Sequence, residues 1–537
     1  MASTLERDPG LLEDFRRLWG QAPSARLRLA LGLAGVVVVV GVVLRFWSPT
    51  ALWLDETISV NIAKLPLTAI PKALSHDGSP PLYYYVLHFW MLAFGQSDFA
   101  VRALSGVVSV ASLPLFWSAG RRFGGQRTAW VTFGLGLTSP FAIDYATTTR
   151  MYSFMIFWTL LGVGILWRVL EEPTRRRRIA LGALTAAILY THYYGIYLVA
   201  TVGLWFFWRI VRESRKGPSP LDPPGIRPAF GAMVIGVVCW LPWAPVFIYQ
   251  TLHTGSPWTG SAGPADLLGI FGDFAGNGAW GALLSFGFFA LVILGIFGRP
   301  TEAISDDGRP TSGVLLVGRP HADVLPLVVI LAGTLVVAVA LDAIAQAAFV
   351  ARYASVVLPL FLILVALGVS VIRDRRVFAV LAGVACLAGL LSASGAKGDQ
   401  RTEATRVAAV LNVQAQPGDL VVYCPDQLGP AVSRLLTVPQ VTQLTFPRAI
   451  GPQRVDWVDY KSTVSKTDVG TFAQQTLGRL GANHTLWLVW RDGYPGLGGS
   501  CGYLHSWFNM LRHAGETVVH ATPGQYYEYE NLVRYSS

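Results

Sequence analysis

The sequence is poor in charged residues and in cysteine. Only 14% of its 537 residues are Asp, Glu, Lys or Arg, and it holds four cysteines without a CxxC pair or metal-ligand spacing. So few cysteines exclude a disulfide framework. Because Cys239 and Cys386 lie in apolar segments, Cys424 and Cys501 are the one plausible disulfide pair.

Apolar residues dominate instead. The chain is 53% hydrophobic with a mean hydropathy of +0.46, and several apolar runs are long enough to cross about 30 Å of hydrocarbon. The composition therefore indicates a multi-span membrane protein. A net charge of +10 can indicate a nucleic-acid partner. Here the Arg residues form short clusters between apolar runs, where the positive-inside rule explains them, so no nucleic-acid partner is predicted.

We predict a polytopic α-helical protein with about eleven transmembrane helices. The apolar run 29–44 is interpreted as an uncleaved first span, with segment 1–28 in the cytoplasm. The later Arg clusters all fall on the cytoplasmic side, whereas 250–279 on the outer side has neither Lys nor Arg. If the short spans 179–191 and 194–211 were a single span, the orientation of every later span would be inverted. The later Arg clusters argue against this arrangement. The other spans are 101–119, 128–143, 153–169, 179–191, 194–211, 229–249, 280–298, 324–341, 353–372 and 377–394.

The character of the sequence changes near residue 395. Helix-like pieces such as 402–413 alternate with strand-like pieces such as 420–423, which predicts a soluble α/β domain over 395–537, doubly wound or close to it. An odd number of spans places this domain outside the cytoplasm, after a transmembrane domain over 29–394. It has no GxGxxG or P-loop, so we expect no nucleotide site and interpret it as a lid or an acceptor-docking platform.

Unusual polar groups gather at the outer ends of the spans. Asp55 and Glu56 emerge from the first span into an outer loop, 47–100, and adjacent carboxylates beside hydrocarbon are costly enough to suggest a chemical task. Each polar group has an ordinary alternative role, as a helix cap, a snorkelling Arg or a hydrogen-bonded core His. Because all these polar groups lie on the outer side of the membrane, they indicate a functional site there. The others are His76, Asp77, Asp144, Arg150, Tyr152, His192, Tyr193, Tyr194, Asp342, Arg352 and Tyr353.

Short motifs on this face follow one another in a particular order. They are Asp55-Glu56, Ser79-Pro80-Pro81-Leu82-Tyr83-Tyr84, Phe99-Ala100-Val101-Arg102-Ala103-Leu104-Ser105, Arg150-Met151-Tyr152-Ser153, Thr191-His192-Tyr193-Tyr194-Gly195 and Arg352-Tyr353. In this order they resemble the bacterial family 39 glycosyltransferases, which are similar to protein O-mannosyltransferases and to the aminoarabinose transferase of lipid A modification. The resemblance covers 29–394 and is strongest over the first two hundred residues. One departure is Thr148 or Thr149, which stands where many relatives carry a carboxylate.

The resemblance implies a glycosyltransferase C fold and a reaction of the cell envelope. A single mannose- or arabinose-like sugar would move, with inversion, from a polyprenyl-phosphate carrier to an acceptor hydroxyl of a protein, lipid or cell-wall glycan. The site would face outward from the bacterial inner membrane. An alcohol nucleophile needs a positioned base, so we assign Asp55 as the base, with Glu56 orienting the acceptor or the loop.

The leaving lipid phosphate needs positive charge and hydrogen-bond donors rather than a strong acid. Arg352, Arg150, His192, Tyr193 and Tyr353 are the candidates for this phosphate site. Trp53, Tyr83 and Tyr84 are candidates for packing on the sugar or the isoprenoid. The only cofactor that the sequence indicates is a possible divalent cation. His76 and Asp77 could hold a divalent cation at the phosphate, although a hydrogen bond within the loop is the simpler interpretation.

Three other classes of protein fit parts of the pattern. A transporter or flippase of a lipid-linked sugar would show internal repeats and polar groups near mid-membrane, whereas the polar groups here cluster at one rim. A polymerase or ligase using a glycan on lipid pyrophosphate is separated from single-sugar transfer only by the resemblance. A membrane scaffold that presents the C-terminal domain leaves the outer-face charges unexplained.

Overall fold

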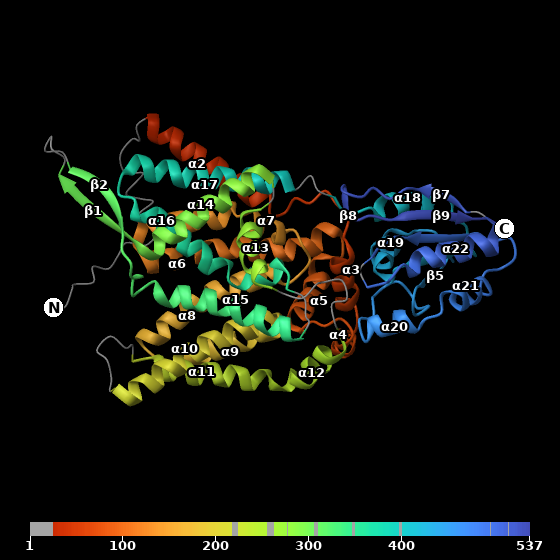
Figure 1. Cartoon of the computed structure of the whole chain (residues 1–537), viewed down its shortest axis with the longest axis horizontal. Coiled ribbons are helices and arrows are strands. Elements are labelled where there is room, and N and C mark those ends of the chain that lie inside the picture. Colours follow the sequence, from red (N-terminus) through yellow and green to blue (C-terminus); the bar gives the residue numbers. More distant parts are fainter. Residues whose placement is uncertain are drawn as a thin grey trace.

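The computed structural model describes residues 25–216, 224–254, 263–276, 278–304, 310–345, 349–396, 400–494, 496–513 and 515–536. A bundle of helices makes up most of the molecule, and a smaller part containing a β-sheet lies at one end of it (Figure 1). Most of the predicted cytoplasmic segment 1–28 lies outside the described residues, so its placement stays a prediction.

Within the described residues, seven helical segments are long and apolar enough to cross a membrane. They contain α6 (Asp98–Thr138), α8 (Tyr152–Glu171), α10 (Tyr194–Lys216), α11 (Ile226–Trp240) continued by α12 (Ala244–His253), α14 (Gly278–Phe297), α15 (Leu325–Ala345) and α17 (Arg375–Ala396). Shorter helices in the bundle are α2 (Ala25–Val43), α5 (Leu82–Phe94), α9 (Arg175–Thr191) and α16 (Leu358–Val371). Each of the eleven predicted spans contains a helix, while the number of crossings stays a prediction.

Helix α6 is two helices that reverse direction at Gly124 and Gly125, whose backbone angles are not helical. A Cβ on Gly120 would lie 2.4 Å from Oγ1 of Thr132, so the two halves approach too closely for a side chain there. The two spans predicted at 101–119 and 128–143 therefore form a helical hairpin.

The second predicted span of this hairpin ends earlier than expected. Ser139 has left the helical conformation, and its side chain accepts a hydrogen bond from the Ala142 N–H. Pro140 then occupies the first turn of α7 (Pro140–Ala146). The helix predicted to run to residue 143 stops at Thr138 because this Ser-Pro pair starts a new helix.

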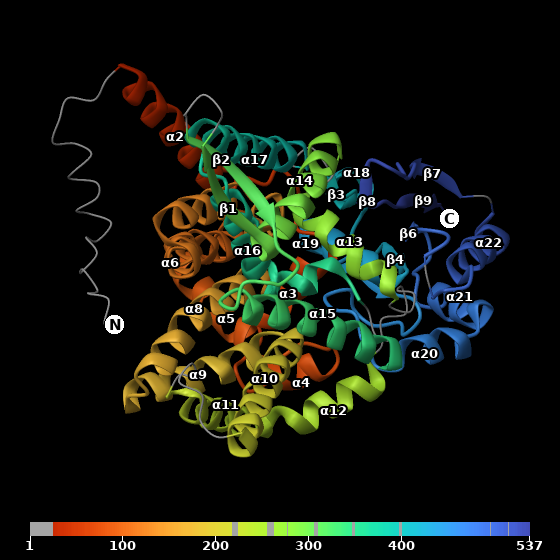
Figure 2. The same ribbon diagram turned by 60° about the vertical axis from the view of Figure 1, so that its left-hand side comes forward.

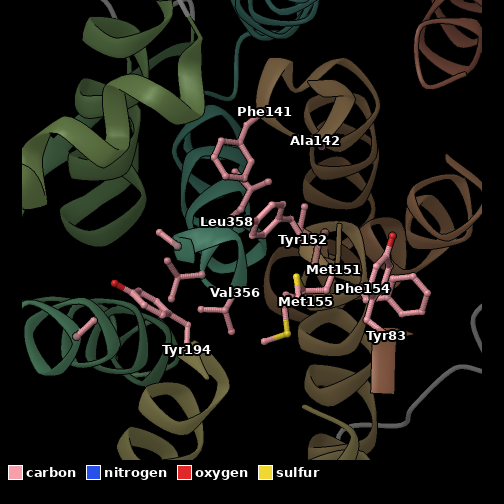
Figure 3. Close-up of a cluster of buried hydrophobic side chains, with 14 of the residues drawn as sticks. Tyr83, Phe141, Ala142, Met151, Tyr152, Phe154, Met155, Tyr194, Val356 and Leu358 are labelled. Atoms are coloured by element: carbon pink, nitrogen blue, oxygen red, sulfur yellow. The ribbon is translucent and has the colours of Figure 1, made fainter. Parts of the chain in front are cut away.

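A buried apolar cluster joins several of these helices. Figure 3 shows Tyr83, Phe141, Tyr152, Tyr194 and Leu358 within it, drawn from α5, α7, α8, α10 and α16. Helix α16 is the most enclosed of these elements, since every residue from its start through Val369 is buried. This packing gives the outer loops a rigid base.

The C-terminal part contains a five-stranded sheet in the order β5-β4-β6-β9-β7. Its strands are β4 (Leu420–Cys424), β5 (Thr442–Thr445), β6 (Leu486–Trp490), β7 (Glu516–Val519) and β9 (Asn531–Tyr535). Strands β5, β4 and β6 are parallel, whereas β9 and β7 are antiparallel to their neighbours. The sheet is therefore mixed. A fully parallel doubly wound sheet is not formed because β9 runs back beside β7, with only the short strand β8 and no helix between them in the sequence.

Helices cover both faces of this sheet. Val421 of β4 packs in a cluster with α18 (Ala404–Gln414) and α19 (Gly429–Leu435), and Leu420 packs in another with α21 (Val469–Leu477) and α22 (Ser500–Arg512). Such double covering explains why β4 is an unbroken apolar run, with all five residues buried.

Two short β-pairs lie outside the main sheet. Strands β1 (Gly298–Ile304) and β2 (Pro310–Leu316) form a hairpin at the end of the bundle away from the sheet (Figure 1). Strands β3 (Gln400–Thr402) and β8 (Tyr526–Glu528) pair in parallel where the bundle meets the C-terminal part. The sequence analysis did not predict either pair.

The two parts also meet beside α12. The backbone N–H of Asp459, just before α20 (Tyr460–Lys466), donates to the carbonyl of His253 at 2.8 Å, and Figure 2 shows the two helices next to each other. The C-terminal part is therefore joined to the bundle at more than one place.

Cys424 and Cys501 form a disulfide that links the end of β4 to the start of α22. We expect the double variant Cys424→Ser/Cys501→Ser to lose about 2–5 kcal/mol of stability, because the bond closes a long loop in the unfolded chain. A thermal unfolding scan would show this as a lower Tm. Cys239→Ser, at an exposed free cysteine, is the control. An unchanged Tm in the double variant would contradict the expectation.

Candidate active site

A cavity of about 670 Å³ lies where the helical bundle meets the C-terminal part. Its walls come from the loop before α3 (Leu54–Ala63), from α7, α8 and α13 (Pro264–Ala275), from the short helix η2 (Ala351–Val356), and from β3 and β8. Phe141 and Tyr152 belong both to the cavity wall and to the buried cluster of Figure 3. Its polar and aromatic lining includes Trp53, Asp144, Tyr145, Thr148, Tyr152, Asp266, Asp273, Arg352, Arg401 and Tyr527.

Asp55 and Arg352 form an ion pair next to this cavity. Trp53 is the extended residue before α3, so Asp55 stands in the first turn, where the positive end of the helix favours a carboxylate. Nη2 of Arg352 lies 3.7 Å from Oδ2 of Asp55, and the two side chains are 16% and 20% exposed. The guanidinium also lies 5.9 Å from the Trp53 ring centre and 5.5 Å from that of Tyr353. The carboxylate of Asp55 and the guanidinium of Arg352 are therefore close together, and the rings of Trp53 and Tyr353 pack beside the guanidinium.

Glu56 is fully buried and is not among the residues that line the cavity. Arg102 donates from Nε and Nη2 to its two carboxylate oxygens at 2.8 and 2.6 Å, and the Thr149 N–H donates to Oε1 at 2.8 Å. Burial opposes ionisation, but the charge and hydrogen bonds of Arg102 lower the pKa of Glu56. Both oxygens of the carboxylate are therefore engaged in joining α3 to α6 and to the turn before α8.

Arg150 contacts Ser59 of α3 and belongs to a series of polar contacts that continues to Asp77. Its Nη1 is 3.3 Å from both Oγ of Ser59 and Oη of Tyr84, and the Tyr84 hydroxyl donates to Asp77 at 3.0 Å. Burial raises the pKa of Asp77. Tyr83 is buried beside these contacts, with its ring 5.6 Å from that of Phe154. Arg150 is not among the residues that line the cavity.

His192 and Tyr193 are neighbours in sequence but face different surroundings. The His192 ring lies 4.9 Å from that of Tyr353, and its Nδ1 accepts the Tyr194 N–H at 3.1 Å. The Tyr193 hydroxyl accepts from Nε1 of Trp243 at 2.9 Å and also contacts Gln250. His192 therefore packs against Tyr353, whose ring lies beside Arg352. Tyr193 belongs to a separate hydrogen-bond network.

His76 contacts the C-terminal part. Its Nδ1 lies 2.9 Å from Oδ1 of Asp456, and its carbonyl accepts from the Trp457 N–H at 3.1 Å. Asp77, the next residue, is directed to Tyr84. In the described part of the chain no three His, Cys, Asp or Glu side chains cluster as metal ligands would.

Three residues of the C-terminal part reach the site. Arg401 donates from Nη2 to Asp144 at 2.5 Å and from Nη1 to Thr148 at 2.7 Å. The Tyr527 ring meets Trp53 edge-on at 5.7 Å, and the Glu528 carboxylate accepts the Leu54 N–H at 3.2 Å. Burial raises the pKa of Glu528 to about 8. Sequence reasoning missed these three residues, since nothing in their local sequence marks contacts made across hundreds of residues.

The apolar helices of the bundle are those of a multi-pass membrane protein, and their arrangement is the glycosyltransferase C fold. Two crystal structures of ArnT from Cupriavidus metallidurans have this fold. The one bound to undecaprenyl phosphate aligns with a TM-score of 0.55 at 13% identity, covering 96% of this chain and 99% of that chain. The apo form gives 0.56 at 14%, covering 94% and 98%. The predicted polytopic glycosyltransferase C fold is confirmed, while the number of crossings and the extracytoplasmic C-terminal domain stay predictions.

Residues 78–221 match the family model described as dolichyl-phosphate-mannose-protein mannosyltransferase. This segment begins in the outer loop and contains Arg102, Arg150 and His192. The predicted resemblance to the family 39 glycosyltransferases is therefore confirmed over this segment. No curated protein matches it by sequence.

Proposed function

We propose that this protein is an inverting glycosyltransferase that moves a single sugar, hexosyl or pentosyl, from a polyprenyl-phosphate carrier to an acceptor hydroxyl. The Asp55–Arg352 pair, 3.7 Å apart at the edge of a cavity of about 670 Å³, carries the proposal. The bound undecaprenyl phosphate of the ArnT structure supports the class of donor. The mannosyltransferase family model supports sugar transfer from a lipid phosphate.

Asp55 is the general base in this mechanism. The acceptor hydroxyl attacks the anomeric carbon of the sugar while its proton passes to the carboxylate of Asp55. The bond between that carbon and the phosphate oxygen breaks in the same step, which inverts the configuration. The phosphate oxygen leaves with the electron pair, and the Arg352 guanidinium stabilises its negative charge.

The other site residues position these two. Glu56, held by Arg102, anchors the turn at 147–150, and the chain from Asp77 through Tyr84 to Arg150 supports the back of α3. Trp53 and Tyr527 offer aromatic surfaces to the sugar or the isoprenoid. Aromatic faces pack well on such apolar surfaces.

The disulfide supports a site outside the cytoplasm. Structural disulfides persist in oxidising compartments, and Cys424–Cys501 lies in the C-terminal part that closes the cavity. We therefore place the site at the outer face of the bacterial inner membrane, with the N-terminus in the cytoplasm. A lipid-linked donor that has already crossed the membrane can reach it there, whereas a nucleotide sugar would remain on the other side.

Arg352→Gln should weaken the binding of undecaprenyl phosphate roughly 10- to 100-fold, because a charge-assisted contact to the phosphate is lost. The measurement is a binding titration with the purified full-length protein. Arg479→Gln, which removes an exposed charge at the end of α21, is the matched control and should bind as the wild type does. Equal affinity in Arg352→Gln would move the phosphate site elsewhere.

A further inference from the structure

Two guanidinium groups from distant parts of the chain line the same cavity. Arg352 comes from η2 in the helical bundle, and Arg401 comes from β3 at the start of the C-terminal part. The side chain of Arg401 is 19% exposed, close to the 16% of Arg352. A partly buried cation in a cavity is costly unless an anion compensates it. Arg352 forms an ion pair with Asp55, and Arg401 forms one with Asp144, while the charge of the buried Glu56 also acts on Arg401.

The position of Arg401 is fixed from both sides. Strand β3 pairs with β8 at Gln400 with Tyr526 and at Thr402 with Glu528, so Arg401 lies between two paired residues. Glu528 in turn accepts the N–H of Leu54, the residue before Asp55. The short β3–β8 pair therefore ties the backbone of Arg401 to the start of α3, next to the proposed base.

We propose that Arg401 binds the donor phosphate together with Arg352, so that the C-terminal part supplies a substrate-binding residue as well as covering the site. This inference rests on the proposed function. A guanidinium has five N–H donors, so contacts with Asp144 and Thr148 do not exhaust Arg401. Its planar fork suits a phosphate in a way that few other side chains do.

The negative charge of the carrier phosphate increases during the reaction, and a second guanidinium would stabilise this added charge. A polyprenyl-phosphate sugar is a phosphodiester with one negative charge. When the sugar leaves, the carrier becomes a phosphate monoester, which carries about −1.5 to −2 near neutral pH. A second guanidinium in the cavity adds positive charge and N–H donors where the negative charge of the leaving phosphate develops, and groups aimed at developing charge accelerate a reaction.

The competing role for Arg401 is purely structural: its pair with Asp144 would fasten the C-terminal part to the bundle. The two roles predict opposite effects for Asp144→Asn. If Arg401 binds phosphate, removing the carboxylate frees the guanidinium and leaves the affinity for undecaprenyl phosphate unchanged or tighter. If Arg401 only fastens the two parts, Asp144→Asn breaks the same pair and behaves like Arg401→Gln.

The test is a binding titration of undecaprenyl phosphate with full-length wild type, Arg401→Gln, Asp144→Asn and Arg534→Gln. Arg534 pairs with the exposed Glu516 in the C-terminal part but does not line the cavity, so its variant is the control. We expect about a 10-fold or greater loss of affinity in Arg401→Gln alone. Arg401→Lys keeps the charge and should bind more tightly than Arg401→Gln. A thermal unfolding scan of each variant separates a loss of binding from a loss of folding.

Wild-type affinity in Arg401→Gln would overturn this inference, and so would an equal loss in Asp144→Asn. In both cases the wild type still binds the lipid phosphate and the proposed function stands. A wild-type protein that does not bind undecaprenyl phosphate at all would overturn the proposed function, and this inference with it.

Discussion

Asp55→Asn should lower the rate of sugar transfer roughly 100- to 10,000-fold, the contribution usual for a general base. Asparagine keeps the size of the side chain but cannot accept the proton of the acceptor hydroxyl. Binding of undecaprenyl phosphate should be unchanged or tighter, because the carboxylate 3.7 Å from Arg352 loses its charge. Single-turnover transfer and lipid-phosphate binding, measured on the same purified samples, separate these two effects.

The matched control is Asp468→Asn. Asp468 is an exposed carboxylate that caps α21 by accepting the Thr471 N–H, a role that asparagine also performs well. It should leave transfer unchanged. Near wild-type transfer in Asp55→Asn would remove Asp55 as the base and would direct attention to the other carboxylates of the cavity, Asp144, Asp266 and Asp273.

Glu56→Gln should destabilise the protein by about 3–5 kcal/mol, because it removes one partner of a buried ion pair and leaves the charge of Arg102 uncompensated. The Glu56 side chain is 0% exposed and that of Arg102 is 6% exposed. The loss should appear as a lower Tm, and transfer should fall as well, since Glu56 also holds the Thr149 N–H.

An exposed pair of the same chemistry provides the comparison. Glu516 and Arg534 are 66% and 40% exposed with N and O atoms 3.4 Å apart. Glu516→Gln should change stability by less than about 1 kcal/mol, as is usual for surface pairs. If both variants shift Tm equally, Glu56 is not the anchor that its contacts indicate.

The bundle could be predicted largely from the sequence, because apolar runs of sufficient length have few alternatives in a membrane. Its irregular elements could not. The end of the first hairpin depends on the capping of α7 by Ser139, which competes with an apolar pattern that continues to residue 143. The β1–β2 and β3–β8 pairs are short, and their pairing depends on partners that local patterns do not identify.

Two residues of the candidate site could be predicted from their own positions in the sequence. Asp55 stands out because charge is costly beside hydrocarbon, and Arg352 because positive charge on the outer face opposes the topological bias. The structure brings these two together. It places Tyr193 in a separate hydrogen-bond network, and Arg150 does not line the cavity although the charge of Asp55 acts on it. It adds Arg401, whose contact with Asp144 spans 257 residues. Such a contact leaves no local signal in the sequence.

The central claim is that the protein consumes a polyprenyl-phosphate sugar. The most direct measurement adds radiolabelled donors of this class to native membranes that contain the protein and its endogenous acceptors, and to proteoliposomes of the purified protein. We expect one donor to label an acceptor in the wild type and not in Asp55→Asn, and the labelled product would identify the acceptor. Labelled lipid that crosses the bilayer without being consumed would contradict the account and would make the protein a transporter.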